Sequence, residues 1–463
     1  VSVLYWLRGS VARFFRMAVV PPQQQPGAAP GATQPPQRQG PNDQLDGDLS
    51  DWIKNFDAMI PGGTHASFSR VWSGVGQHEQ FQKMSAAVQH VSGKLAQASA
   101  LNDEIANELK AHANKAYSER KFNAAIAMYT RALMYAKTAA TAAVLANNRA
   151  AVMLEQGLPL AALADAHYAR QADPTFTKAL ARRAKCLSML GQTELAAADT
   201  AAAEGNDSAA TGADAAAVEA IVAKALEDVG LPSDSHLVAS GDASTGTVAF
   251  TNEAVFERGP KHSEKGHHVR AKAEAGPGTT VVVETPAVSA PRAEGLLCSC
   301  AWCHRQTMCL YPCKEHMAKG VRSRGLFCSD ACAAASWAAF GARESNNAFW
   351  LACPVDALLG FRLQQRVAAS APGSVLRKRY DELREWSKEV DAGATAGGLE
   401  SACACAAVAF GAMDPLKAGD LVTAMRKLLA NATPIAFTDR VTPDGAPAAK
   451  AQQHSFVKMT VAK

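Results

Sequence analysis

The sequence predicts a mainly α-helical protein with a smaller α+β part, and three observations support this fold class. Alanine is abundant and aromatic residues make up only 6% of the 463 residues, which favours packed helices over an all-β sandwich. Residues 102–205 carry apolar side chains at helical spacing and repeat that pattern. Residues 269–273 instead alternate apolar and polar side chains, and a Gly-Pro-Gly turn and three valines at 281–283 follow, as in a β-hairpin. The chain is long enough for roughly two to four domains.

Composition and charge exclude several classes of protein. Hydrophobic residues make up 48% and charged residues 19%, so a sizeable core can form and disorder of the whole chain is excluded. No apolar run approaches the roughly 20 residues of a membrane-spanning helix. We therefore expect no membrane span and a cytoplasmic or nuclear location. A net charge of +4 is small, and no basic stripe with interleaved aromatic residues is present, so we expect no nucleic-acid partner.

The N-terminal part differs in composition from the rest of the chain. Residues 1–45 are predicted to be a disordered, low-complexity tail, because Pro, Gln and Gly dominate from residue 19 onward. Residues 1–16 contain three arginines and no acidic residue, which fits either a targeting peptide or sequence that precedes a true start at Met17. Residues 46–101 indicate a mixed segment of short helices.

Residues 102–205 consist of three similar segments, 108–136, 144–174 and 177–205. Each segment reads as a helix, a turn and a second helix with small alanines where the helices must approach closely. This pattern resembles the tetratricopeptide (TPR) repeat of about 34 residues, for which three copies are about the minimum of a stable array. The alternative is an alanine-rich helical bundle without true repeats.

The first helices of these segments carry a set of hydrogen-bond donors. Two of the donors are four residues apart on one helix, and so are two others, so each of these pairs shares a helix face. The set consists of Lys110, Asn114, Asn148, Lys178 and Arg182. It resembles the clamp with which some TPR domains hold the acidic Glu-Glu-Val-Asp tail of heat-shock chaperones, since cations and amides match paired carboxylates. The alternative is ordinary solvated charge on helix faces.

A change in character follows the repeats. Residues 206–261 are rich in Ala, Asp and Ser and are predicted to be a linker with one helix at 214–228. Residues 262–297 are predicted to hold a β-hairpin, in which strands near 269–273 and 281–283 flank a Gly-Pro-Gly turn.

Eight of the eleven cysteines lie between residues 298 and 353, which indicates metal binding. Two close pairs are four thiolates at the spacing of a structural zinc site: Cys300, Cys303, Cys328 and Cys332. A third pair, Cys313 and His316, lies between them, and Cys353 lies downstream, which suggests an interleaved module with two zinc ions. The alternatives are disulfides or buried free thiols.

These cysteine spacings, with Trp337 shortly after the second pair, resemble the MYND zinc finger. The resemblance implies that Cys300, Cys303, Cys328 and Cys332 hold one zinc ion. It implies that Cys313, His316 and Cys353 hold the second ion together with a late histidine. Phe349 stands where the family has that histidine, so Cys309, Cys298 or His304 is the alternative fourth ligand. The finger is expected over residues 298–353.

The hairpin before the finger and the segment after it resemble the TPR-bearing branch of the SET and MYND lysine methyltransferases. In that family the finger is inserted into the SET domain after such a strand, and residues 354–437 resemble its helical insert. The resemblance implies a partial SET domain that binds S-adenosylmethionine through Lys265, Gly266 and His267. The alternative for these three residues is an ordinary hairpin turn.

Two functions follow as hypotheses. The first is a fragment of a protein-lysine methyltransferase; residues 438–463 are expected to be a truncated tail, because the family's Asn-His-Ser-Cys motif and late tyrosine are absent from the sequence. On this view we expect no catalytic residue and no methyl transfer from the chain itself. The second is an adaptor that joins a TPR groove for chaperone tails to a zinc finger that binds short peptides.

Overall fold

The fold was analysed in a computed structural model, which describes a defined part of the chain. The described residues are 92–93, 95–205, 212–227, 237–242, 247–252, 254–258, 269–276, 282–284, 287–291, 296–383 except 306, 385, 403–438 except 405 and 409, and 453–460. The predicted tail over residues 1–45, nearly all of the mixed segment 46–101 and the three predicted cofactor residues lie outside this part. The predicted cofactor residues are Lys265, Gly266 and His267.

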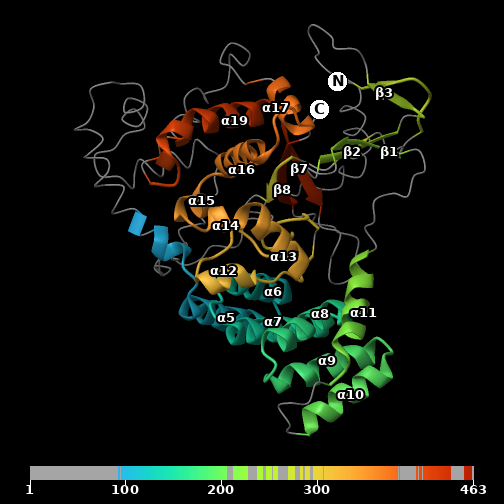
Figure 1. Cartoon of the computed structure of the whole chain (residues 1–463). Coiled ribbons are helices and arrows are strands. Elements are labelled where there is room, and N and C mark those ends of the chain that lie inside the picture. The colour runs from blue at the N-terminus through green and yellow to red at the C-terminus, as the bar shows by residue number, and fades with distance from the viewer. Residues whose placement is uncertain are drawn as a thin grey trace, which may run out of the picture.

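The described chain is mainly helical and begins with a TPR-like array over residues 103–204 (Figure 1). Three helix pairs follow one another, as the repeat pattern predicts. They are α5 (Asp103–Ser118) with α6 (Phe122–Leu133), α7 (Ala139–Glu155) with α8 (Pro159–Ala172), and α9 (Thr177–Met189) with α10 (Thr193–Glu204).

Local chemistry explains where these helices begin and how closely they pack. The side chain of Asn102 accepts hydrogen bonds from the first backbone amides of α5, and Thr138 does the same for α7. Small residues such as Ala113 and Ala125 are fully buried, so the helix backbones approach each other closely. The turns inside the second and third pairs place Gly157 and Gly191 at φ 70° and 74°, a conformation that glycine adopts without strain.

Two buried ion pairs show the repeat most directly. Arg149 on α7 pairs with Asp165 on α8 at 2.7 Å. Arg183 on α9 pairs with Asp199 on α10 at 2.6 Å, and both members lie 34 residues after their counterparts. The same ion pair therefore recurs with the period of a TPR repeat.

The predicted linker contains more structure than expected. Helix α11 (Ala215–Glu227) confirms the predicted helix and packs against α8. Strands β1 (Leu237–Asp242), β2 (Thr247–Asn252) and β3 (Phe256–Arg258) lie in the segment where only a linker was expected.

The predicted hairpin after the linker is wrong in its pairing. The two strands exist, as β4 (Val269–Ala271) and β5 (Val282–Glu284), but β4 pairs with β3 and β5 pairs with β2. Register explains part of this choice, because β3 places Glu257 opposite Arg270 and the two side chains form an ion pair at 2.6 Å. Strands β2 and β3, which the sequence analysis did not predict, are the pairing partners of β5 and β4.

The cysteine-rich segment and the region after it contain short helices and a small sheet. The helical elements are α12 (Lys314–Lys319), α13 (Asp330–Ser336), a π-helical turn (Trp337–Gly341), α14 (Ala342–Glu344), α15 (Ala348–Ala352), α16 (Val355–Ala369), α17 (Val375–Glu382), a 3₁₀ turn (Pro415–Lys417) and α19 (Ala418–Asn431). Helices α16 and α19 pack closely at Gly360, where an added Cβ would lie 2.6 Å from the Met425 side chain. Helix α16 lies at the start of residues 354–437, the segment for which the resemblance predicts helices.

A three-stranded sheet joins distant parts of the chain. Its order is β6 (Ser289–Pro291), β8 (Gln453–Thr460) and β7 (Ala432–Thr438), and all pairs are antiparallel. Strand β7 lies at the predicted strand entry, whereas β8 lies in the segment that was expected to be a tail. No helix in the described part of the chain is both long enough and apolar enough to span a bilayer.

Candidate functional sites

Four cysteines converge as the sequence predicts. The Sγ atoms of Cys300, Cys303, Cys328 and Cys332 all lie within 4.8 Å of one another. The Cys328 sulfur lies 3.6 Å from that of Cys303 and 3.7 Å from that of Cys332. Four sulfurs around one zinc ion at a bond length of about 2.3 Å would be separated by about 3.8 Å, so the cluster has the size of a tetrahedral zinc site.

A tight turn, a β-bridge and a helix position the four thiols. The backbone amide of Cys300 donates to the Arg305 carbonyl at 2.9 Å, and this tight turn brings Cys303 back toward Cys300. Backbone hydrogen bonds between Tyr311 and Phe327 form an isolated antiparallel β-bridge, which fixes the chain directly before Cys328. Cys332 lies in the first turn of α13, which begins at the Ser329 cap.

The thiols also influence each other's protonation. Hydrogen bonds from the Cys300, Cys328 and Cys332 thiols lower the pKa of Cys303. The Cys300 thiol likewise lowers the pKa of Cys332, whereas the pKa values of Cys300 and Cys328 are raised, chiefly by hydrogen bonds with their neighbours in the cluster. Thiolate is the form that binds metal, so the cluster favours the required state at two of its members. No cysteine within the described residues forms a disulfide, which argues against the disulfide alternative. The donor set and the spacing together fit one zinc ion.

The residues predicted for a second zinc site do not meet. His316 packs edge-on against Trp337 with ring centroids 4.8 Å apart, and the Cys353 thiol contacts the Trp350 carbonyl at 3.6 Å. Cys313 is buried at the start of α12. Among the described residues the four-cysteine cluster is the one group of metal ligands, so the second site stays a prediction from the resemblance.

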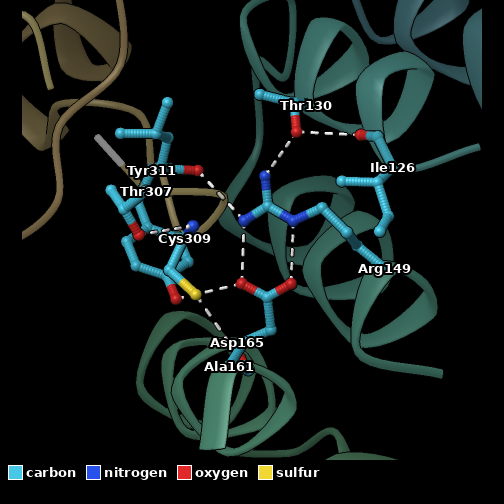
Figure 2. A network of polar contacts seen from close by, with 9 residues as sticks. Ile126, Thr130, Arg149, Ala161, Asp165, Thr307, Cys309 and Tyr311 are labelled. Carbon is cyan, nitrogen blue, oxygen red and sulfur yellow. Dashed lines mark hydrogen bonds and ion pairs between the residues drawn. The ribbon is translucent and has the colours of Figure 1, made fainter. Parts of the chain in front are cut away.

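The cysteine-rich segment docks on the second helix pair of the array (Figure 2). Arg149 donates to Asp165 through Nε and Nη2, to the Thr130 hydroxyl at 2.8 Å, and to the Leu310 carbonyl at 3.2 Å. The Tyr311 hydroxyl donates to Asp165 at 3.0 Å. Every polar group of this fully buried ion pair is thus satisfied, partly by the array and partly by the cysteine-rich segment.

The five predicted groove residues lie on the first helices of the three pairs, as the repeat pattern requires. Lys110 and Asn114 are on α5, Asn148 is on α7, and Lys178 and Arg182 are on α9. Lys178 and Asn114 are exposed, while Asn148 and Arg182 are half-buried. Lys110 Nζ donates to Asn107 Oδ1 at 2.6 Å.

Contacts link the groove residues of the first and third pairs. The Tyr129 hydroxyl, on α6, donates to Asn114 Oδ1. The Arg182 guanidinium donates to the Asn147 carbonyl and lies near the phenol groups of Tyr117 and Tyr129. Burial lowers the pKa of Arg182, and these phenols oppose that effect. Asn114 and Arg182, 68 residues apart in the sequence, therefore both interact with Tyr129, the first through a hydrogen bond and the second electrostatically.

Sequence reasoning missed two kinds of residue. The Arg149–Asp165 pair had a signal, since Arg and Asp recur 34 residues later as Arg183 and Asp199. Tyr129 had none, because its role depends on where a side chain from α6 reaches between two other helices.

Comparisons with known proteins find two partial matches to the chain. No protein-family model matches the chain. The serine/threonine-protein phosphatase T of Trypanosoma brucei brucei is 45% identical over 89 residues, which are 19% of this chain and 18% of that protein. The match thus spans less than two thirds of the relative. The TPR domain of Sgt2 from Aspergillus fumigatus is 27% identical over 93% of its length and 30% of this chain, with a TM-score of 0.20.

Proposed function

We propose that the protein is an interaction adaptor whose TPR-like groove binds acidic C-terminal peptides, such as the Glu-Glu-Val-Asp tails of heat-shock chaperones. The observation that carries this proposal is that Tyr129 hydrogen-bonds to Asn114 and interacts electrostatically with Arg182, so donors of the first and third helix pairs lie near one side chain. A groove that draws donors from the first and third helix pairs can surround the end of a peptide.

The chemistry of the five side chains suits a terminal residue with two carboxylates. Lysine and arginine supply positive charge, and the two asparagines supply N–H donors without adding any negative charge. Hydrogen bonds to charged groups contribute about 1.5–3 kcal/mol each. Several such bonds give micromolar affinity without a large apolar contact, which is the range expected of a reversible adaptor.

The zinc module has a structural part in this proposal. Zinc held by Cys300, Cys303, Cys328 and Cys332 would cross-link the two parts of the segment that carry these cysteines. The role would be structural, because a closed four-thiolate shell leaves no position for a substrate. The module carries the Leu310 carbonyl and the Tyr311 hydroxyl that complete the buried network on the array. Binding of short peptides by the finger itself stays a prediction from the resemblance.

Methyl transfer from S-adenosylmethionine also stays a prediction from the resemblance. The three residues predicted to hold that cofactor lie outside the described part of the chain. No observation on the described residues favours this activity over the adaptor.

The proposal is tested with a fluorescent peptide that ends in Glu-Glu-Val-Asp and with the double variant Lys178→Ala/Arg182→Ala. Two charged donors are lost, so we expect fluorescence anisotropy to show at least a hundredfold weaker binding. The matched control is Lys121→Ala/Lys137→Ala, which removes the same charge from two exposed lysines at either end of α6. Equal affinity of wild type and the Lys178/Arg182 variant would refute the groove.

A further inference from the structure

Tyr129 occupies an unusual place for a core residue of a helix pair. Only 2% of its surface is exposed, and it packs with the small residues between α5 and α6. Its hydroxyl nevertheless reaches the groove side of α5, where it donates a hydrogen bond to Asn114 Oδ1. The same phenol lies close enough to the Arg182 guanidinium for the two groups to interact electrostatically.

We infer that Tyr129 is a positioning residue of the peptide groove, which orients the Asn114 amide so that its N–H donors face the terminal carboxylate of the ligand. The inference rests on the proposed function and names a residue that the predicted set of five does not contain. Tyr129 itself need not touch the peptide.

The donor and acceptor inventory of the asparagine side chain explains the role. A primary amide has one oxygen acceptor and an NH₂ group with two donors, and the two ends exchange by a flip about the last bond. A carboxylate can only accept hydrogen bonds, so the ligand is attracted by the NH₂ end and repelled by the oxygen end. Because the Tyr129 hydroxyl occupies Oδ1, the NH₂ end is left for the ligand.

The Tyr129 hydroxyl must keep its proton for the hydrogen bond to Asn114 to persist. Burial raises the pKa of Tyr129 to about 12, with the nearby Tyr117 acting in the same direction and Arg182 against it. The phenol therefore retains its proton at neutral pH and can donate it to the amide oxygen, as it does here. An amide that is oriented before the ligand arrives loses less freedom on binding, which increases affinity.

The test compares wild type with Tyr129→Phe, which keeps the buried ring and removes only the hydroxyl. Two peptides ending in Glu-Glu-Val-Asp are used, one with a free C-terminal carboxylate and one with a C-terminal amide. Loss of one orienting hydrogen bond should weaken binding of the free-acid peptide roughly fivefold. Binding of the amidated peptide, which lacks that carboxylate, should change by less than twofold, and a general packing defect would instead weaken both.

Two further variants sharpen the test. Tyr117→Phe removes the other phenol near Arg182 and leaves the bond from Tyr129 to Asn114 intact, so its affinity should stay within about twofold of wild type. Asn114→Asp keeps an acceptor for Tyr129 but presents no donor, so it should weaken binding of the free-acid peptide more than Tyr129→Phe does.

The outcomes separate this inference from the proposed function. Wild-type affinity in Tyr129→Phe, or equal weakening for both peptides, would overturn the positioning role even if the Lys178/Arg182 variant loses binding. Retained binding in the Lys178/Arg182 variant would contradict the proposed peptide groove, and with it the positioning role of Tyr129.

Discussion

At the scale of single residues, the array depends on charges that are buried in pairs. The Arg183 and Asp199 side chains are almost completely buried, and so are those of Arg149 and Asp165. Each arginine uses its fork to bind the carboxylate through two atoms, a geometry that a lysine would not reproduce. Such pairs cost desolvation energy, so their value lies in fixing the angle and register between helices.

Breaking one pair gives a clear prediction. Asp199→Ala should lower the free energy of unfolding by about 3–5 kcal/mol, because it leaves the Arg183 guanidinium buried without a counter-charge. The double variant Arg183→Met/Asp199→Leu should cost less than this single change. Urea unfolding monitored by circular dichroism measures both.

The control for this experiment is an exposed pair. Glu257→Ala breaks the ion pair with Arg270, whose side chain is 57% exposed, and should change the unfolding free energy by less than about 1 kcal/mol. If the double variant at 183 and 199 is no more stable than Asp199→Ala, the unpaired Arg183 charge is not the cause of the destabilisation.

At the scale of helices and strands, local patterns were predictable and distant pairings were not. The helix pairs follow from apolar spacing, caps and turns, all of which lie within a few residues of each other. Strand β4 pairs with β3, which lies shortly before it but was not predicted, and β8 pairs with β6, which lies far from it in the sequence. Residues 453–460 were expected to be part of a tail, and nothing local says which strands they join.

The turns between paired helices allow a test at this scale. Gly191→Ala should destabilise the array by about 1 kcal/mol, because its φ of 74° disfavours any side chain. The same substitution at Gly419, inside α19 and with open space around it, should instead be neutral or slightly stabilising. Thermal melting of the two variants is compared; equal shifts of the same sign would show that the turn conformation is not what matters.

At the scale of the whole molecule, two buried arginine–aspartate pairs of the same kind anchor two other segments of the chain to the array. Asp165 accepts a hydrogen bond from the Tyr311 hydroxyl, and Arg149 donates one to the Leu310 carbonyl of the cysteine-rich segment. In the next repeat Asp199 accepts from the backbone amide of Ala213, just before α11, and Arg183 donates to the carbonyl of the same residue. The four cysteine ligands were predictable from their spacing, whereas this docking was not, because it matches repeat surfaces with a segment more than 100 residues away.

Metal removal tests the organisation of the cysteine-rich segment. Cys328→Ser should reduce the zinc content from about one ion per chain toward zero, since three thiolates no longer close the shell. The matched control is Cys186→Ser, because Cys186 is a buried cysteine of α9 outside the cluster. Elemental analysis of the purified proteins measures the ratio, and an unchanged zinc content in Cys328→Ser would mean that the cluster is not the zinc site.

The central claim is that the helical array recognises the acidic end of a peptide. The most direct measurement is isothermal titration of the wild-type chain with the free-acid Glu-Glu-Val-Asp peptide and with its amidated counterpart, at low and at high salt. We expect micromolar binding of the free acid, at least tenfold weaker binding of the amide, and a loss of affinity as salt rises. Equal binding of the two peptides, or binding that salt does not weaken, would contradict the account.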